Sequence, residues 1–96
     1  MPLPKVSVVL VNFRGIDDTL NAIKTIQDTD YPKEQLEIVV VDNASGDNSV
    51  EKLKDLSNQI VLVESSENLG FAGGVNLGVK KSTGQIIGLI LQLTLS

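Results

Sequence analysis

The segment Leu36–Gly46, with the sequence LEIVVVDNASG, decides which fold this chain can adopt. Its first half contains an uninterrupted run of β-branched residues, Ile38–Val41, that does not alternate with polar residues. Such a run is typical of a strand that is buried on both faces, as in a parallel sheet covered by helices. Asp42 and Asn43 therefore fall at the carboxyl end of a buried strand, where open α/β sheets bind their ligands.

Two interpretations of Asp42 and Asn43 follow from this position. A carboxylate there can accept a hydrogen bond from a nucleobase N–H group or from a sugar hydroxyl. The alternative is structural, because Asp and Asn side chains often bond to nearby backbone and form an Asx-type turn, here leading into the next helix. The spacing of the residues alone does not favour either interpretation.

The composition of the whole chain limits its chemistry. Its 96 residues include no Cys and no His, which leaves any acid–base chemistry to Asp, Glu, Lys and Tyr. The net charge of −4 argues against a nucleic-acid-binding surface. No signal-peptide pattern is present, and the longest apolar stretch, Ile86–Leu95, is too short to span a bilayer. We therefore expect a cytoplasmic protein without a transmembrane segment.

The rest of the chain alternates between strand and helix patterns. Lys5–Asn12 is a second buried-strand pattern, a short strand is predicted at Gln59–Glu64, and a fourth strand at Ile86–Leu93. A helix pattern lies in each interval, so the order is β-α-β-α-β-α-β with short links. This order predicts an α/β fold with a mainly parallel sheet and flanking helices. No linker or internal repeat interrupts residues 1–96, which we interpret as one domain.

The predicted helices have recognisable start signals. Asp17 or Asp18 is expected to cap the first helix, since Asp is a preferred residue at that position. Asn48 and Glu51 have the spacing of a capping box for the second helix. The third helix is expected to follow a glycine-rich turn and to end before Gly84.

The glycine-rich turn lies within Ser65–Lys81, SSENLGFAGGVNLGVKK, and its glycines begin at Gly70. Glycine lets backbone approach a ligand closely, and the N-terminus of the following helix favours negative charge. Asn68 and Asn76 flank the glycines and add polar groups. The alternative is that the glycines let the helix pack tightly on the sheet while Asn68 caps it. The segment matches neither the dinucleotide-binding G-x-G-x-x-G fingerprint nor the P-loop.

Three segments together resemble family 2 glycosyltransferases of the GT-A fold: VSVVLVNF from Val6, VVVDNASGDNS from Val39 and NLGFAGGVNLG from Asn68. Within that family they are most similar to the rhamnosyltransferase-like branch that builds bacterial surface polysaccharides. The segments occur in the order that the family has. Val75 departs from the pattern, because that branch often has Asn at this place. The resemblance implies the Rossmann-like nucleotide-binding half of a GT-A fold.

The resemblance also implies an activity: inverting transfer of a sugar from a UDP- or dTDP-sugar to an acceptor hydroxyl in polysaccharide or cell-surface glycan synthesis. The residues that match the family's nucleotide-sugar-binding site are Asn12, Phe13, Asp42, Asn43, Asn68, Gly70 and Asn76. Among these, Asp42 is expected to bind the base, since a uracil or thymine N3–H donating to a carboxylate forms a charge-assisted hydrogen bond.

The end of the chain departs from the family. Family members carry an Asp-x-Asp-like motif there that holds Mg or Mn against the diphosphate. Here the corresponding segment is Leu91–Thr94, LQLT, which has no carboxylate, and the catalytic base is also missing. We therefore expect a partial GT-A domain, truncated before the metal-binding motif, without catalytic or metal-binding residues of its own and inactive as a fragment. The alternative is a non-catalytic nucleotide-binding or interaction module with the same βαβ core.

The predicted fourth strand has a further consequence. In the family's fold this strand lies next to the first strand of the sheet. If nothing covers its outer edge, which is rich in Ile and Leu, the unpaired backbone predicts dimerisation or aggregation through this strand.

Overall fold

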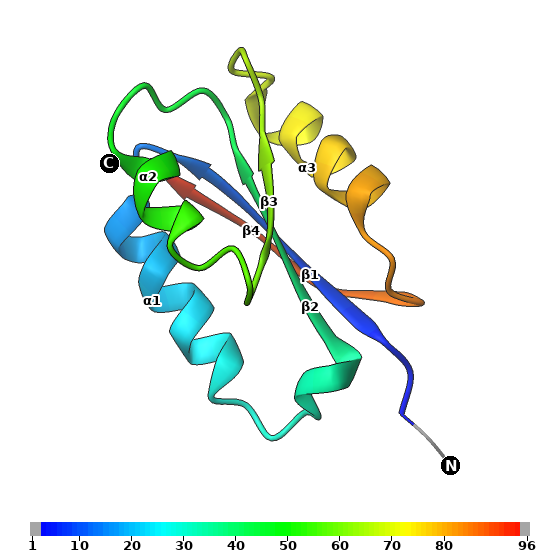
Figure 1. Ribbon diagram of the computed structural model, residues 1–96. Coiled ribbons are helices and arrows are strands. Elements are labelled where there is room, and N and C mark those ends of the chain that lie inside the picture. The colour runs from blue at the N-terminus through cyan, green and yellow to red at the C-terminus, as the bar shows by residue number, and fades with distance from the viewer. Residues whose placement is uncertain (1–2, 95–96) are drawn as a thin grey trace.

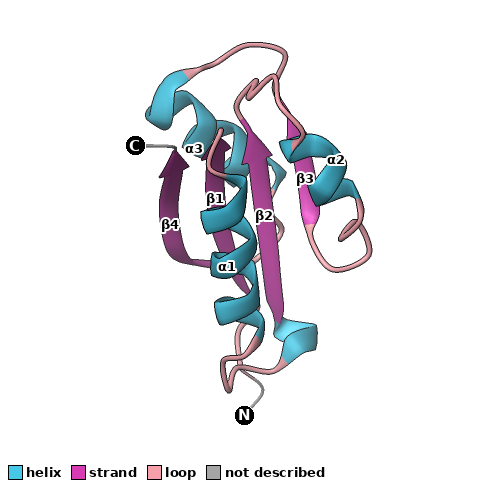
Figure 2. Ribbon diagram, turned by 90° about the vertical axis from the view of Figure 1, so that its left-hand side faces the viewer, coloured by secondary structure: helices cyan, strands magenta, loops and turns pink. Residues whose placement is uncertain are grey.

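The computed structural model of the chain describes residues 3–94 and contains a four-stranded sheet with helices on both faces (Figure 1). The elements in chain order are β1 (Val6–Phe13), α1 (Ile16–Gln27), the 3-10 helix η1 (Lys33–Gln35), β2 (Leu36–Asp42), α2 (Ser49–Lys54), β3 (Val61–Glu64), α3 (Gly70–Lys81) and β4 (Ile86–Thr94). The strands lie in the order β3-β2-β1-β4 and every neighbouring pair is parallel, so all arrowheads point to one end (Figure 2). The predicted α/β class and parallel sheet are confirmed.

The two central strands form the buried middle of the sheet. In β1 the residues Ser7–Asn12 are all buried, and in β2 the residues Ile38–Asp42 are. The parallel register between the strands places Asn12 beside Asp42. The continuous apolar runs in the sequence thus correspond to strands with helices on both faces. The first polar residues after the two runs, Asn12 and Asp42, lie side by side.

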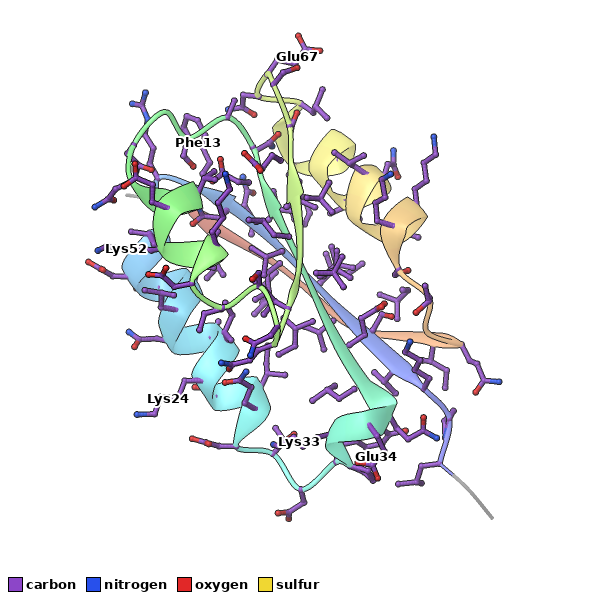
Figure 3. The ribbon with its side chains drawn as sticks, in the orientation of Figure 1. Phe13, Lys24, Lys33, Glu34, Lys52 and Glu67 are labelled. Carbon is purple, nitrogen blue, oxygen red and sulfur yellow. The ribbon has the colours of Figure 1, made fainter. Side chains whose placement is uncertain are left out.

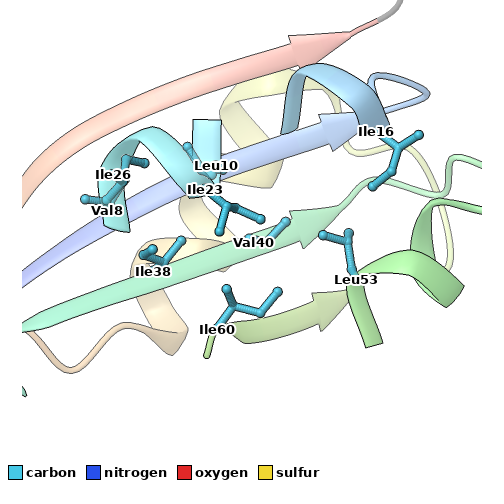
Figure 4. Packing of buried hydrophobic residues seen from close by; sticks show 9 residues of the cluster. All are labelled: Val8, Leu10, Ile16, Ile23, Ile26, Ile38, Val40, Leu53 and Ile60. Carbon is cyan, nitrogen blue, oxygen red and sulfur yellow. The ribbon is translucent and has the colours of Figure 1, made fainter. Parts of the chain in front are cut away.

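The face of the sheet under α1 and α2 carries the larger part of the core. Side chains from β1, β2, both helices and the segment before β3 interlock there (Figure 4). The buried residues of this cluster are Val8, Leu10, Ile16, Ile23, Ile26, Ile38, Val40, Leu53 and Ile60. Burial of such side chains is the main favourable term in folding, at about 25 cal/mol for each Å² of apolar surface.

The opposite face is covered by α3, which packs on the sheet through glycine. A Cβ atom added to Gly74 would lie 2.7 Å from Val11 Cγ1, and one added to Gly78 would lie 2.5 Å from Val9 Cγ1. Helix α3 therefore rests almost directly on the valines of β1 and β2. The interpretation of the glycines as residues that allow tight packing is confirmed for Gly74, and Gly78 makes a second contact of the same kind.

The first helix begins differently from the prediction. Its N-cap is Gly15, which offers no side-chain cap, and the helix already includes Asp17 and Asp18 in its first turn. The prediction that one of these aspartates caps α1 is therefore wrong. Their negative charges still stabilise the helix, because they lie at the positive end of its dipole.

The second helix is capped by a neighbour of the predicted residue. Asn48 holds the N-cap position of α2, but its side chain makes no cap hydrogen bond, so the predicted capping box with Glu51 does not form. Asp47 takes this role, since its Oδ1 accepts a hydrogen bond of 2.9 Å from the Ser49 N–H. The predicted start of the helix is thus correct within a residue or two, while the capping side chain is not.

Strand β4 forms one edge of the sheet. It pairs with β1 as predicted, with a register shift at Gly88, which is skipped between the pairs Ser7–Ile87 and Val8–Leu89. Within residues 3–94 no strand pairs with its other side. The strand sequence, IIGLILQLT, contains no charged residue, and the exposed fractions of Ile86 and Ile90 are 48% and 39%.

At the end of the sheet where the strands begin, the Glu37 carboxylate holds the loop between α3 and β4 in place. Glu37 accepts hydrogen bonds from Ser7 Oγ at 2.8 Å, Thr83 N at 2.8 Å and Thr83 Oγ1 at 2.9 Å, and Lys5 Nζ lies 3.8 Å away. Burial by itself raises the pKa of Glu37, but the hydrogen bonds from Thr83 and Ser7 and the charge of Lys5 outweigh it. The net result is a pKa below the ordinary value of 4.5.

Candidate functional site

The polar residues at the carboxyl ends of β1 and β2 form a buried hydrogen-bond network. Asn12 Nδ2 donates to Asp42 Oδ1 at 2.9 Å, and Thr19 Oγ1 on α1 donates to Asn12 Oδ1 at 2.6 Å. Asn12 is fully buried and Asp42 is 3% exposed. A buried carboxylate is tolerated only when hydrogen bonds replace its water, and Asn12 supplies one of them.

Ser45, in the loop after β2, supplies the others. Its Oγ–H donates to Asp42 Oδ1 at 2.7 Å, and its backbone N–H donates to Asp42 Oδ2 at 3.2 Å. The structural interpretation is correct in part: Asp42 bonds to the backbone of the following loop, but to the third residue after it, and the Asn43 side chain makes no such local bond in the described part of the chain. Oδ2 accepts only this one bond in the described residues, so it retains a lone pair for a further donor.

Asn43 links the end of β2 to the beginning of α3. Its Oδ1 accepts a hydrogen bond from Leu69 N at 2.9 Å, and its Nδ2 donates to Gly70 O at 2.9 Å. Asn68 Oδ1 accepts from Gly70 N at 2.8 Å and so satisfies the first amide of the helix, although Leu69 and not Asn68 occupies the N-cap position. Gly70 has a φ of +73°, a conformation that favours glycine.

The loops after β1 and β2 also contact each other directly. Two non-glycine residues there are left-handed, Arg14 with a φ of 58° and Ala44 with a φ of 62°. Arg14 N donates to Ser45 Oγ at 2.9 Å, and Arg14 Nε donates to Ser45 O at 3.0 Å. The guanidinium carbon of Arg14 lies 5.1 Å from the centre of the Phe13 ring, within the range of a cation–π contact.

The structure gathers most of the predicted site residues at one end of the sheet. Phe13 is half-buried at the end of β1, and in Figure 3 it lies toward the same end of the sheet as Glu67 and opposite Lys33 and Glu34. The other residues gathered there are Asn12, Asp42, Asn43, Asn68 and Gly70.

Asn76 is separated from this group. It is exposed, and it lies two positions from both Gly74 and Gly78, whose Cα atoms face the sheet. At about 100° per residue, this spacing puts Asn76 on the outer side of α3.

Three members of the network are not among the residues predicted from the sequence: Thr19, Ser45 and Arg14. Ser45 carried a local signal, because it lies three residues after an Asp in a turn-like segment. Thr19 and Arg14 carried none, since their contacts depend on how α1 and the two loops pack.

The described residues do not fit a divalent metal ion. Within residues 3–94 no group of three or more His, Cys, Asp or Glu side chains could hold one. Asp42 already accepts three hydrogen bonds, and β4 has no carboxylate near its end. No helix in the same range is long and apolar enough to cross a membrane.

Cavities alone would not have located this network. A cavity of about 600 Å³ lies at the other end of the sheet and is lined by Gln27, Lys33 and Asn58 among others. Next to the network lies a smaller pocket of about 190 Å³, lined by residues from Arg14 to Asp18. The buried polar contacts, which tie two strand ends to a helix start, therefore mark the candidate site better than cavity size does.

The strand order, the parallel pairing and the polar strand ends define the class: an α/β fragment that matches the nucleotide-binding half of a GT-A fold. The chain belongs to glycosyl transferase family 2, because the sequence model of that family matches residues 7–90. A curated relative, glycosyltransferase AglE of Haloferax volcanii, is 28% identical over 92 residues, which cover 92% of this chain and 30% of the relative.

Two solved structures extend the comparison. The mannosyltransferase PcManGT from Pyrobaculum calidifontis, in complex with GDP-Man and Mn²⁺, has a TM-score of 0.80 and 27% identity over 88% of this chain and 26% of its own. S. aureus TarS 1–349, in complex with UDP, has a TM-score of 0.75 and 25% identity over 93% of this chain and 27% of its own. The chain thus spans less than a third of the length of these relatives.

Proposed function

We propose that this chain binds the nucleoside diphosphate part of a sugar donor at the carboxyl ends of β1 and β2. One observation carries the proposal: the network around Asn12 and Asp42 and the start of α3, held by Asn43, meet at one end of a parallel sheet. Membership of glycosyl transferase family 2 supports it, as do the nucleotide ligands of the two solved relatives.

The geometry suggests a role for each part of the site. Phe13 offers an aromatic ring on which a base can stack. The free lone pair of Asp42 Oδ2 can accept a base N–H, provided that the loop after β2 moves enough to admit it. The N-terminus of α3 at Asn68–Gly70 can attract the diphosphate through its dipole. Asn76, on the outer side of α3, is the predicted residue with the least support.

The whole protein's activity is part of the same proposal. We infer an inverting transfer of the sugar to an acceptor hydroxyl in glycan synthesis, with a UDP- or dTDP-sugar as donor, and the rhamnosyltransferase-like branch remains our assignment from the motifs. Mg or Mn bound to the diphosphate would supply positive charge for the leaving group. Because residues 3–94 do not fit that ion, this chain is proposed to bind the donor without transferring the sugar.

Amide chemical shifts measured during titration with UDP, dTDP and GDP, each with and without magnesium, test donor binding. We expect shifts at Phe13, Asp42, Asn43 and Gly70. Asp42→Asn, which removes the carboxylate charge but keeps its shape, should weaken binding, whereas Asp55→Asn at the end of α2 should not. The proposal fails if no nucleotide binds the folded chain at about 1 mM. A Kd of about 1 mM corresponds to a binding free energy of only about −4 kcal/mol.

We also propose that two copies of the chain associate through β4. Its outer edge exposes backbone hydrogen-bonding groups along a nine-residue strand without charge, although natural edges are commonly protected by charge or proline. Two copies with a net charge of −4 each repel one another. This repulsion is weakest where uncharged surfaces meet, as they would if the two β4 edges approached each other.

A further inference from the structure

Arg14, the only arginine of the sequence, has three unusual features in one place. Its φ of 58° is left-handed, a conformation that costs a non-glycine residue about 1–2 kcal/mol. Its Nε–H donates to the Ser45 carbonyl oxygen at 3.0 Å, and its guanidinium lies over the Phe13 ring. Backbone strain of this kind concentrates at functional sites, where the surrounding structure maintains it.

We propose that Arg14 is a positioning residue for base binding. Its guanidinium packs on one face of the half-buried Phe13 ring, which leaves the other face for a nucleobase. Its Nε–H holds Ser45, and Ser45 in turn bonds to Asp42. One side chain thereby positions both the stacking ring and the loop residue that bonds to the base-binding carboxylate. This role rests on the proposed donor site.

The surrounding charges argue against direct contact between Arg14 and the diphosphate. Asp17 and Asp18 line the same pocket as the Arg14 side chain, on the first turn of α1. An anion that approached the guanidinium there would also approach these two carboxylates, which oppose it. A role in orienting Phe13 and Ser45 needs no anion at this place.

Lysine provides the decisive variant. Arg14→Lys keeps the positive charge but lacks the planar fork, so one cation cannot both stack on Phe13 and donate from the Nε position to Ser45. Losing that hydrogen bond is expected to weaken uridine and UDP binding by the same factor, about 3- to 10-fold. Binding of magnesium pyrophosphate should not change. Lys24→Ala, an exposed cation in the last turn of α1, is the matched control.

A spectroscopic measurement reports on the same contact. Because the chain has one arginine, its ¹H–¹⁵N spectrum contains a single Nε–H signal. We expect this signal to be protected from exchange in the wild-type chain and to shift when uridine is added. Arg14→Ala and Arg14→Lys are first compared with the wild type by amide spectra, and a variant that does not fold is left out of the binding comparison.

The outcomes separate the two proposals. If the folded wild-type chain binds neither uridine nor UDP, the donor site is wrong and the role of Arg14 is wrong with it. If the wild type binds them and Arg14→Lys binds equally well, only the positioning role is overturned. Equal weakening of pyrophosphate and uridine would also overturn it, since Arg14 would then act on the phosphates.

Discussion

The side chains of Asn12 and Asp42 are joined by a hydrogen bond of 2.9 Å beneath the surface, between two strand ends that lie side by side in the sheet. This contact turns the proposed base-binding carboxylate into a part of the core. Asp42 therefore stabilises the fold, and a ligand that binds to it must leave most of its hydrogen bonds in place.

Replacing Asp42 by alanine should destabilise the fold strongly. The change removes the acceptor of Ser45 N and Ser45 Oγ and one of the two acceptors of Asn12 Nδ2, which keeps its bond to Ser45 Oγ. Each buried group left unpaired costs about 1–3 kcal/mol, so we expect the free energy of unfolding to fall by about 3 kcal/mol or more. Urea denaturation measures it. Asp42→Asn, which keeps one acceptor oxygen, should lose less, and equal losses would contradict the bonding described.

Gly78→Ala tests the contact between α3 and the sheet. The new Cβ would lie 2.5 Å from Val9 Cγ1, so helix and strand must separate, at a cost of about 1–3 kcal/mol in unfolding free energy. Asn76→Ala on the outer side of the same helix should change stability by less than about 0.5 kcal/mol. Adding Val9→Ala to Gly78→Ala should recover part of the loss, and strict additivity of the two changes would contradict the clash.

Ala44→Gly should stabilise the protein. Alanine is strained at a φ of 62°, and the relief exceeds the extra flexibility of glycine in the unfolded chain, for a net gain of about 0.5–1 kcal/mol. The same substitution at Ala72, inside α3, should instead cost about 1 kcal/mol. Thermal unfolding of both variants gives the comparison, and a loss at Ala44 would show that the left-handed conformation is not strained.

Stability should depend on pH through Glu37. Its pKa is lower in the folded chain than the ordinary 4.5, so the folded state binds fewer protons near that pH. The contribution of Glu37 is complete above pH 4.5 and is lost as the pH falls through the folded pKa. Glu37→Gln should flatten this part of the profile of urea midpoint against pH. An unchanged slope in Glu37→Gln would contradict the role of the Thr83 and Ser7 bonds.

Association through β4 should depend on its exposed side chains. Ile90→Lys places a charge on the open edge, which natural sheets use to prevent pairing, so sedimentation should show less dimer than in the wild type. Leu3→Lys changes another exposed apolar residue, away from this edge, and serves as the control. A wild-type chain that stays monomeric at about 1 mM, where even contacts of about −4 kcal/mol would be half occupied, refutes the proposal.

The fold could be predicted largely from local sequence. The runs of β-branched residues around Val9 and Val40 can be satisfied only by strands covered on both faces, and the helix patterns between them require a parallel sheet. The first residues of the helices could be predicted less well from the sequence. Whether Asp17 or Gly15 occupies the N-cap position of α1 depends on backbone dihedral angles, and the structure has a left-handed residue, Arg14, just before Gly15.

The candidate site was accessible only in part. Asn12, Asp42 and Asn43 stand where a strand pattern ends, so their meeting at one sheet edge could be anticipated. The sequence could not indicate that Thr19 bonds to Asn12, because this contact depends on the packing of α1 against β1. Nor could it indicate that Asn43 uses both ends of its amide on α3.

Helix α3 is anchored at both of its ends: Asn43 bonds to its first turn, and Glu37 bonds to Thr83 just beyond its last. Between these anchors the helix touches the valines through Gly74 and Gly78, which have no rotamers with which to absorb a displacement. If α3 is displaced at one anchor, we therefore expect the whole helix to move as a rigid body. A displacement of α3 at Gly70 is therefore expected to reach the Thr83 loop, which lies at the far end of the sheet from the proposed nucleotide site.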